Sequence, residues 1–230
     1  MTAEPTAGSR HFHDQLATLK QRLLAMSARA EELVERAVDA LLTRDAGKAH
    51  AVIDADREID RMELEVEQLA VELLALQQPM ARDLRFLISA IKVNSDIERV
   101  GDHAVNIAQS ALRLLELPTR LAPESSLAEM ARRARGMLAD ALDAFVRADG
   151  ALGRDIGRRD DEVDAMHESL FRVLLTHMMA DPRTINPGLE QLLVSRNLER
   201  VADLATNIGE DAVFLAEGRQ IKHHAESLAP

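Results

Sequence analysis

Apolar residues recur at alternating steps of three and four along most of this chain, which is the spacing of helices that bury one face. The first run predicts a helix over about residues 9–43. A short break at Asp45 to Gly47 separates it from a second run, which ends before Pro79. A third run extends from near Pro79 to Pro118. Because proline opens or ends a helix, we expect three long helices within residues 9–117.

The second part of the chain repeats the first with a shift of 104 residues. The apolar positions of residues 23–41 then coincide with those of 127–145. After a linker at 118–124, Ser126 with Glu129 three residues later predicts a capping box that opens the fourth helix. The expected buried faces include Leu84 on the third helix and the following positions on the fifth: Ile156, Val163, Met166, Leu170 and Val173.

The third helix of each half repeats with a shift of 101 residues, so three residues are missing before the sixth helix. Residues 94–108 and 195–209 are identical at seven of fifteen positions, which indicates a duplication. The sequence therefore predicts an all-α protein of six long helices, arranged as two tandem three-helix bundles. The bundles span residues 9–117 and 125–217, and a C-terminal tail follows at 218–230.

The amino-acid composition limits the kinds of fold, site and partner that the chain can have. Five Phe with no Trp or Tyr leave the core to aliphatic residues, which suits helices better than sheets. The absence of cysteine excludes disulfides and thiolate metal sites. The longest uncharged stretch, residues 73–81, is far shorter than the roughly 20 residues of a membrane helix, so we expect a soluble, cytoplasmic protein. A net charge of −11 disfavours nucleic acid as a partner.

Acidic residues recur where the two halves correspond. Residues four apart on a helix lie on one face, so Glu98, Asp102 and Asn106 form an oxygen-rich stripe. Its twin consists of Glu199, Asp203 and Asn207. The second helix of each half carries a pair at the same spacing, Asp56 with Asp60 and Asp160 with Asp164.

A single acidic pair at this spacing is ordinary solvated surface, and core packing does not require one. Four pairs kept at equivalent places, despite the repulsion within each, favour a metal site built from carboxylate oxygens. Such ligands suit magnesium, manganese, calcium or iron. His167, whose counterpart is Glu63, is the histidine placed where a metal could use it. Arg99 and Arg200 are expected either to pair with Asp102 and Asp203 or to contact a partner.

The segment PMARDLRFLISAIKVNSDIERVGDHAVNIA at 79–108, its shorter counterpart LLVSRNLERVADLATNIGED at 192–211 and the acidic pairs resemble the PhoU family over nearly the whole chain. The resemblance implies two three-helix bundles related by an internal pseudo-twofold axis. It also implies metal clusters (Mg, Mn, Fe or Zn, singly or multinuclear) at Asp56, Asp60, Glu98, Asp102, Asp160, Asp164, Glu199 and Asp203.

The same resemblance implies a function without catalysis. The expected role is a negative regulator of phosphate uptake and of the phosphate-starvation response. Its expected partners are the ATPase subunit of the phosphate ABC transporter and the phosphate sensor histidine kinase. A homodimer that reaches the membrane only through these partners is also expected.

Two other functions fit the same pattern. A di-metal carboxylate enzyme would also be a helical bundle, but that class carries a Glu-x-x-His pair on each of two helices. Asp164 with His167 is the one near match in this sequence. A scaffold whose acids merely keep it in solution is the third reading. Metal analysis of the purified protein separates it from the first two.

Overall fold

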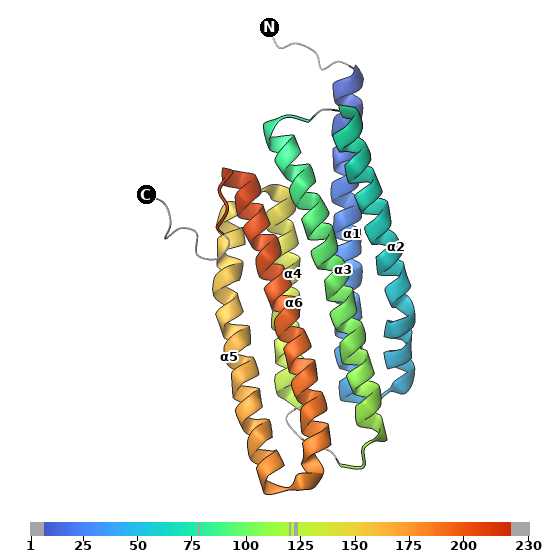
Figure 1. Ribbon diagram of the computed structural model, residues 1–230, viewed down its shortest axis with the longest axis vertical. Coiled ribbons are helices and arrows are strands. Elements are labelled where there is room, and N and C mark those ends of the chain that lie inside the picture. Colours follow the sequence, from blue (N-terminus) through green and yellow to red (C-terminus); the bar gives the residue numbers. More distant parts are fainter. Residues whose placement is uncertain (1–6, 78, 120, 122–123, 222–230) are drawn as a thin grey trace.

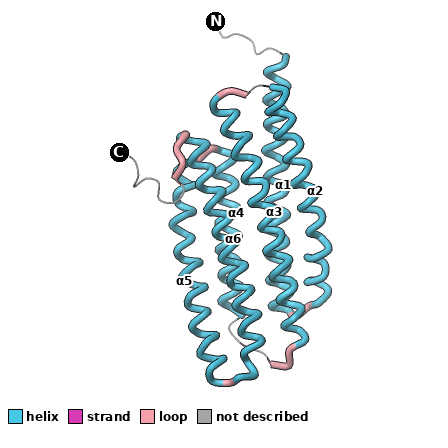
Figure 2. The backbone as a smooth tube through the Cα atoms, viewed as in Figure 1, coloured by secondary structure: helices cyan, strands magenta, loops and turns pink. Residues whose placement is uncertain are grey.

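The computed structural model describes residues 7–77, 79–119, 121 and 124–221. Within these residues the chain is helical and contains no strand, as Figure 2 shows, so the all-α prediction is confirmed. The elements are α1 (Ala7–Thr43), α2 (Ala46–Gln77), α3 (Ala81–Glu116), α4 (Glu124–Arg147), α5 (Gly150–Ala180), a 3₁₀ turn (Pro182–Thr184) and α6 (Ile185–Glu217).

The six helices form two three-helix bundles that lie side by side along the long axis of the molecule (Figure 1). Between the bundles, α1 packs against α4 and α3 packs against α6, so each of these four helices meets its own repeat counterpart. The chain direction of α3 is opposite to that of α6 (Figure 1). This arrangement confirms the expected pseudo-twofold relation, whose axis passes between α3 and α6.

The turn from the first to the second helix is built in the same way in both halves. Arg44 and Ala148 are 104 residues apart, and both adopt a left-handed backbone with φ of 53° and 54°. The next residue then caps the following helix: Asp45 Oδ1 accepts from Lys48 N at 3.1 Å, and Asp149 Oδ1 accepts from Leu152 N at 3.0 Å. A left-handed residue ends one helix and an aspartate opens the next, as helix termini require.

The fourth helix begins earlier than the sequence predicted. α4 already includes Glu124, so Ser126 lies inside the helix and is not its cap. The Glu129 carboxylate accepts hydrogen bonds from Arg132 Nε and Arg133 Nε, each at 2.8 Å, instead of closing a capping box. Residues 120, 122 and 123 of the expected linker and 222–230 of the expected tail lie outside the described residues.

Aliphatic residues fill a continuous core through both bundles, as the apolar pattern predicted. Two predicted core positions are wrong. Leu84 and Val173 are 38% and 41% exposed, and the buried face of α5 continues instead from Leu170 to Leu174. No helix within the described residues is long and apolar enough to cross a membrane.

Candidate metal centres

The predicted acidic stripes lie on the facing sides of neighbouring helices. In the first half, Glu98 and Asp102 on α3 lie near Asp56 and Asp60 on α2. The pKa of Glu98 is raised to about 7, first by burial and then by repulsion from Asp102, Glu63, Asp60 and Asp56. The structure therefore brings all four predicted residues of this half into one electrostatic group, named here the first acidic cluster.

A glycine lets the two helices of the first cluster approach. A Cβ atom at Gly101 would lie 3.3 Å from Ile59 Cγ2 and 3.4 Å from Asp56 Oδ1. The Asp56 carboxylate is thus held against the backbone of α3, next to the stripe that starts at Glu98. Burial, followed by repulsion from Asp60 and Asp102, raises the pKa of Asp56.

Glu63 joins the first cluster although it was not among the predicted ligands. Its pKa is raised by burial and then by Glu67, Asp60 and Asp102. Glu63 lies three residues after Asp60, not four, so it falls outside the spacing used to find the pairs. The repeat could have indicated Glu63, however, because the counterpart of Glu63 is His167, which is also a residue that can bind metal.

The second half assembles the equivalent group, the second acidic cluster, from Asp160, Asp164, Glu199 and Asp203. The pKa of Asp160 is raised to about 7 by burial and then by Asp164, Asp203, Asp161 and Glu199. Burial and repulsion from Asp203 and Asp161 also raise the pKa of Asp164. Asp160 Oδ1 is buried and has no hydrogen-bond partner among the described residues. A buried carboxylate oxygen without a partner is costly, and a cation would satisfy it.

The two repeat-equivalent arginines, Arg99 and Arg200, behave differently in the two halves. Arg200 Nη1 lies 2.7 Å from Asp203 Oδ2, which is the predicted pair. Arg99 Nη1 instead lies 3.6 Å from Asp96 Oδ1, three residues before it and not after it. The carboxylate of Asp203 is therefore partly neutralised by an arginine, whereas Asp102 is not so paired within the described residues.

Two histidines near the clusters are already engaged. His167 Nδ1 lies 2.9 Å from Ser195 Oγ, which ties the end of the α5 stripe to α6. At the equivalent place in the first half, Asn94 Nδ2 donates to the backbone oxygen of Glu63 at 2.9 Å. His103 Nδ1 lies 2.9 Å from Asn197 Oδ1 across the α3–α6 contact, and burial lowers its pKa.

Both clusters carry carboxylates of the kind that bind cations, but their side chains are not yet arranged as a complete coordination sphere. Among the described residues, no three acidic or histidine side chains are placed to hold a metal ion together as they stand. Yet each cluster combines half-buried carboxylates from two helices with one carboxyl whose pKa is raised to about 7. The residues fit an oxygen-liganded cation, provided that exposed carboxylates such as Asp60 and Asp102 rotate toward it.

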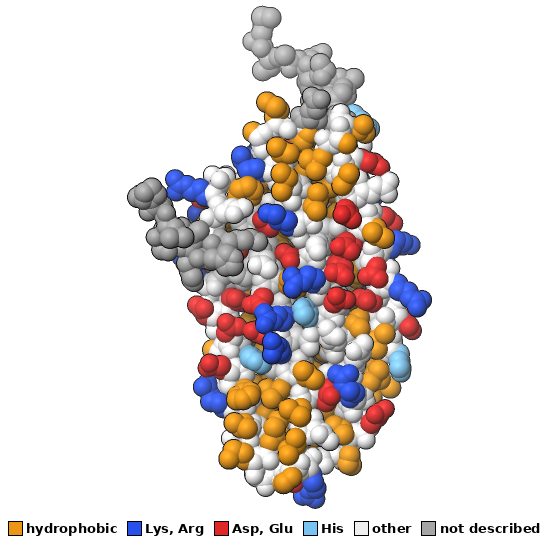
Figure 3. All heavy atoms as spheres, viewed as in Figure 1, with side chains coloured by type: hydrophobic (Ala, Val, Ile, Leu, Met, Phe, Trp, Pro, Cys, Tyr) orange, Lys and Arg blue, Asp and Glu red, His pale blue; other side chains and the backbone are white. Residues whose placement is uncertain are grey.

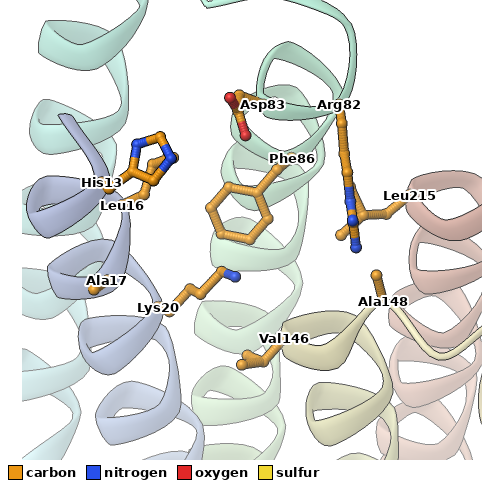
Figure 4. A pocket seen from close by; sticks show the side chains of 10 residues that line it. All are labelled: His13, Leu16, Ala17, Lys20, Arg82, Asp83, Phe86, Val146, Ala148 and Leu215. Carbon is orange, nitrogen blue, oxygen red and sulfur yellow. The ribbon is translucent and has the colours of Figure 1, made fainter. Parts of the chain in front are cut away.

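A cavity of about 350 Å³ lies away from both clusters, at the end of the molecule where α3 begins (Figure 4). Lys20 and Arg82 line this cavity together with apolar residues that include Phe86. The Nζ atom of Lys20 lies 5.0 Å from the centroid of the Phe86 ring. None of the eight predicted site residues lines this cavity. The two acidic clusters are therefore separate from this cavity.

Comparison with known proteins supports the resemblance seen in the sequence. The PhoU domain family model matches residues 23–111 and 127–212, one match in each bundle. A "Phosphate-specific transport system accessory protein PhoU homolog" of Caulobacter vibrioides is 39% identical over 217 residues, which cover 94% of both chains. A homologue with the same description from Pseudomonas putida is 37% identical, over 94% of this chain and 84% of that protein.

Solved structures agree in fold. The crystal structure of PhoU from Pseudomonas aeruginosa is 36% identical, with a TM-score of 0.87 over 90% of this chain and 100% of that one. The phosphate transport system regulatory protein PhoU from Streptococcus pneumoniae is 32% identical, with a TM-score of 0.85 over 92% and 99%. The chain has two repeat-related bundles with paired acidic stripes, and its relatives match it over nearly its whole length. The chain belongs to the PhoU family.

Proposed function

We propose that this chain is a negative regulator of phosphate uptake and of the phosphate-starvation response, and that it acts by binding proteins and not by catalysis. Its relatives are described as phosphate-specific transport system accessory proteins, and the Streptococcus pneumoniae structure as a regulatory protein. One observation carries the proposal for this chain. Two acidic clusters occupy repeat-equivalent positions on helix faces where core packing does not require them.

The proposal includes a cation at each cluster, held by the eight predicted carboxylates and, in the first half, by Glu63. Converging carboxylates suit Mg, Mn, Fe or Zn, singly or as a multinuclear centre. A bound cation would supply positive charge and coordination positions for a partner's carboxylate or phosphate. The support in this chain is the raised pKa of Glu98 and Asp160 and the unpartnered Oδ1 of Asp160.

The proposed partners are the ATPase subunit of the phosphate ABC transporter and the phosphate sensor histidine kinase. A net charge of −11 argues against nucleic acid and anionic lipid as direct partners. We therefore place the protein in the cytoplasm, near the membrane only through these partners. The proposal also keeps the homodimer expected from the family resemblance.

Deletion of the gene tests this role. The deletion strain is expected to express phosphate-uptake genes in phosphate-rich medium, and the wild-type gene is expected to restore repression. Complementation with Glu98→Gln and Asp102→Asn together should restore it only in part, whereas Asp155→Asn, an exposed acid outside the second cluster, should restore it fully. Normal regulation in the deletion strain would reject the proposed role.

No observation favours the di-metal enzyme. That class places a Glu-x-x-His pair on two helices, and here the position of His167 is Glu63 in the other half. The Nδ1 atom of His167 is also engaged by Ser195 Oγ. An assay for oxidase or phosphatase activity in the metal-loaded protein is expected to show none above the level of the free metal.

A further inference from the structure

The cavity where α3 begins lies between the two bundles (Figure 4). The first bundle supplies Lys20, Arg82 and Phe86, and the second bundle supplies Val146 and Leu215. Its volume of about 350 Å³ falls within the roughly 300–1,000 Å³ of sites for small organic molecules. The cavity is therefore large enough for an organic ligand, and not only for an inorganic ion.

Two basic side chains of this cavity are free to bind an anion. Lys20 and Arg82 form no ion pair with a carboxylate in the part of the chain that the structure describes, and Lys20 Nζ lies over the Phe86 ring. Asp83 also lines the cavity, but in Figure 4 its carboxylate lies on the other side of the Phe86 ring from Lys20. The positive charge of the two side chains is thus not neutralised by the acid beside them.

A second cavity, of about 230 Å³ between α4 and α5, has the opposite character. Its arginines are Arg132, Arg133 and Arg159. Arg132 Nε and Arg133 Nε both donate to the Glu129 carboxylate, and Arg159 Nη1 donates to Asp140 Oδ2. An anion would have to displace these carboxylates, so this second cavity is a poorer anion site.

The repeat shows that the free basic residues belong to the first half alone. The counterpart of Lys20, 104 residues later, is Glu124. The counterpart of Arg82, 101 residues later, is Arg183, whose Nη2 atom lies 2.8 Å from Asp181 Oδ2. The second half therefore replaces one of the two basic residues and neutralises the other.

The second half also fills the corresponding space with its own chain. Ala17 lines the cavity, and its counterpart is Leu121, which is 7% exposed. Leu121 Cδ2 lies 3.5 Å from the place of a Cβ at Gly188, and Gln191 Nε2 donates to the Leu121 backbone oxygen at 2.5 Å. Since the same fold closes this space in one half, helix packing does not require it to stay open in the other.

We propose that the cavity where α3 begins binds a small organic phosphate of about the size of a nucleoside monophosphate. A phosphate monoester carries a charge of about −1.5 to −2 near neutral pH, which two basic side chains match. Arg82 can bind the phosphate through two N–H groups, and Lys20 adds a point charge. The organic part would lie on apolar side chains such as Val146 and Leu215.

The acidic clusters do not oppose an anion at this place. Figure 3 shows acidic side chains gathered across the middle of the face formed by α2, α3, α5 and α6. Glu98 follows Arg82 by sixteen residues, or about 24 Å along α3 at the rise of an α-helix. Charges are screened over about 8 Å at physiological salt. The cavity is thus a separate site, and a ligand there needs neither the cations nor the partners proposed above.

Calorimetric titration of the full-length chain tests the proposal, once with Mg and once with chelator. The probes are AMP and phenyl phosphate, with adenosine and inorganic phosphate as the separate parts of AMP. We expect AMP to bind at least tenfold more tightly than adenosine or inorganic phosphate, with and without Mg. Since the ligand contacts both bundles, AMP should also raise the temperature of unfolding.

Two kinds of substitution separate charge from shape. Lys20→Gln and Arg82→Gln should each weaken AMP binding about tenfold, because each removes a charged donor to the phosphate. Lys48→Gln on α2 loses the same charge outside the cavity and should change nothing. Ala17→Leu introduces the residue of the second half and should weaken AMP binding about tenfold without a change in charge. Ala28→Leu, at an exposed position of the same helix, is its control.

Several results would overturn the proposal. They are the failure of both AMP and phenyl phosphate to bind, an equal affinity for adenosine and AMP, and an equal loss in Lys20→Gln and Lys48→Gln. Inorganic phosphate that binds as tightly as AMP would overturn the assignment of an organic ligand. Binding of AMP that disappears in chelator, or in the Glu98→Gln, Asp102→Asn variant, would place the phosphate at the acidic clusters and not in this cavity. Circular dichroism of each variant without ligand checks that it is folded.

Discussion

Replacement of Asp160 by asparagine should stabilise the metal-free protein near neutral pH. Its carboxyl has a pKa of about 7 in the folded protein, above its ordinary value, because burial and neighbouring acids penalise the charged form. Its Oδ1 atom is buried without a partner among the described residues. Asparagine keeps the shape and removes the charge, so the repulsion from Asp164 and Asp203 disappears.

The magnitude follows from the raised pKa. A tenfold change in proton affinity corresponds to about 1.4 kcal/mol. Solvent screening of this half-buried carboxyl reduces the gain in the free energy of unfolding to about 1–2 kcal/mol at pH 7.5. The sign is set by linkage: the folded protein takes up the proton before the unfolded chain does, so stability of the metal-free wild type rises as pH falls from about 7 toward about 4.

Urea denaturation in chelator at pH 7.5 and pH 5 measures both effects. Asp160→Asn is expected to exceed the wild type at pH 7.5 and to approach it at pH 5. Some pH dependence should remain, because the pKa of Glu98 is also raised to about 7. Asp155→Asn, an exposed acid on the same helix, should leave stability unchanged. A variant that is less stable than the wild type at pH 7.5 would refute the reasoning.

Four further substitutions test the local structure by chemical denaturation. Gly153→Ala should destabilise the protein by about 1–3 kcal/mol, because its Cβ would lie 2.5 Å from a backbone oxygen of α6. Gly157 lies one turn later, and a Cβ there would meet nothing closer than 3.9 Å. Gly157→Ala should therefore stabilise the protein by up to about 1 kcal/mol. Asp149→Ala removes the cap of α5 and should cost about 1 kcal/mol. Ala148→Gly should stabilise by up to about 1 kcal/mol, because φ is 54° there. Equal stability of the two α5 glycine variants, or no loss for Asp149→Ala, would contradict these contacts.

Much of the fold follows from the sequence because the duplication states each helix twice. The shift of 104 residues that aligns the apolar positions also aligns the helix ends Thr43 with Arg147 and Ala46 with Gly150. The start of α4 could not be predicted from Ser126, because the carboxylate of Glu129 had two arginines available as partners. The Ser-x-x-Glu pattern of a capping box does not show that nearby arginines can bind the glutamate instead.

The exposed positions on the hairpins show a second limit. Apolar periodicity predicts which residues share a helix face, but it does not tell whether another helix covers that face. Leu84 was therefore expected in the core, although the structure leaves it exposed near the start of α3. Buried and partner-binding apolar faces have the same pattern until the neighbours of the helix are known.

The acidic clusters were predictable as pairs but not as complete groups. Strict four-residue spacing and identity between the halves selected Glu98 with Asp102 and omitted Glu63, whose counterpart is a histidine. The sequence likewise could not choose between the two aspartates that flank Arg99 at three residues' distance. That choice depends on side-chain positions in the folded protein.

The metal content of the reconstituted protein tests whether the two acidic clusters bind cations. Purified chain is stripped with chelator, incubated with Mg, Mn, Fe or Zn, desalted and analysed for bound metal per chain. We expect bound metal in the wild type, about half of it in the Glu98→Gln, Asp102→Asn variant, and little when Glu199→Gln and Asp203→Asn are added. Unchanged metal content in the fourfold variant, or no bound metal in the wild type, would contradict this expectation.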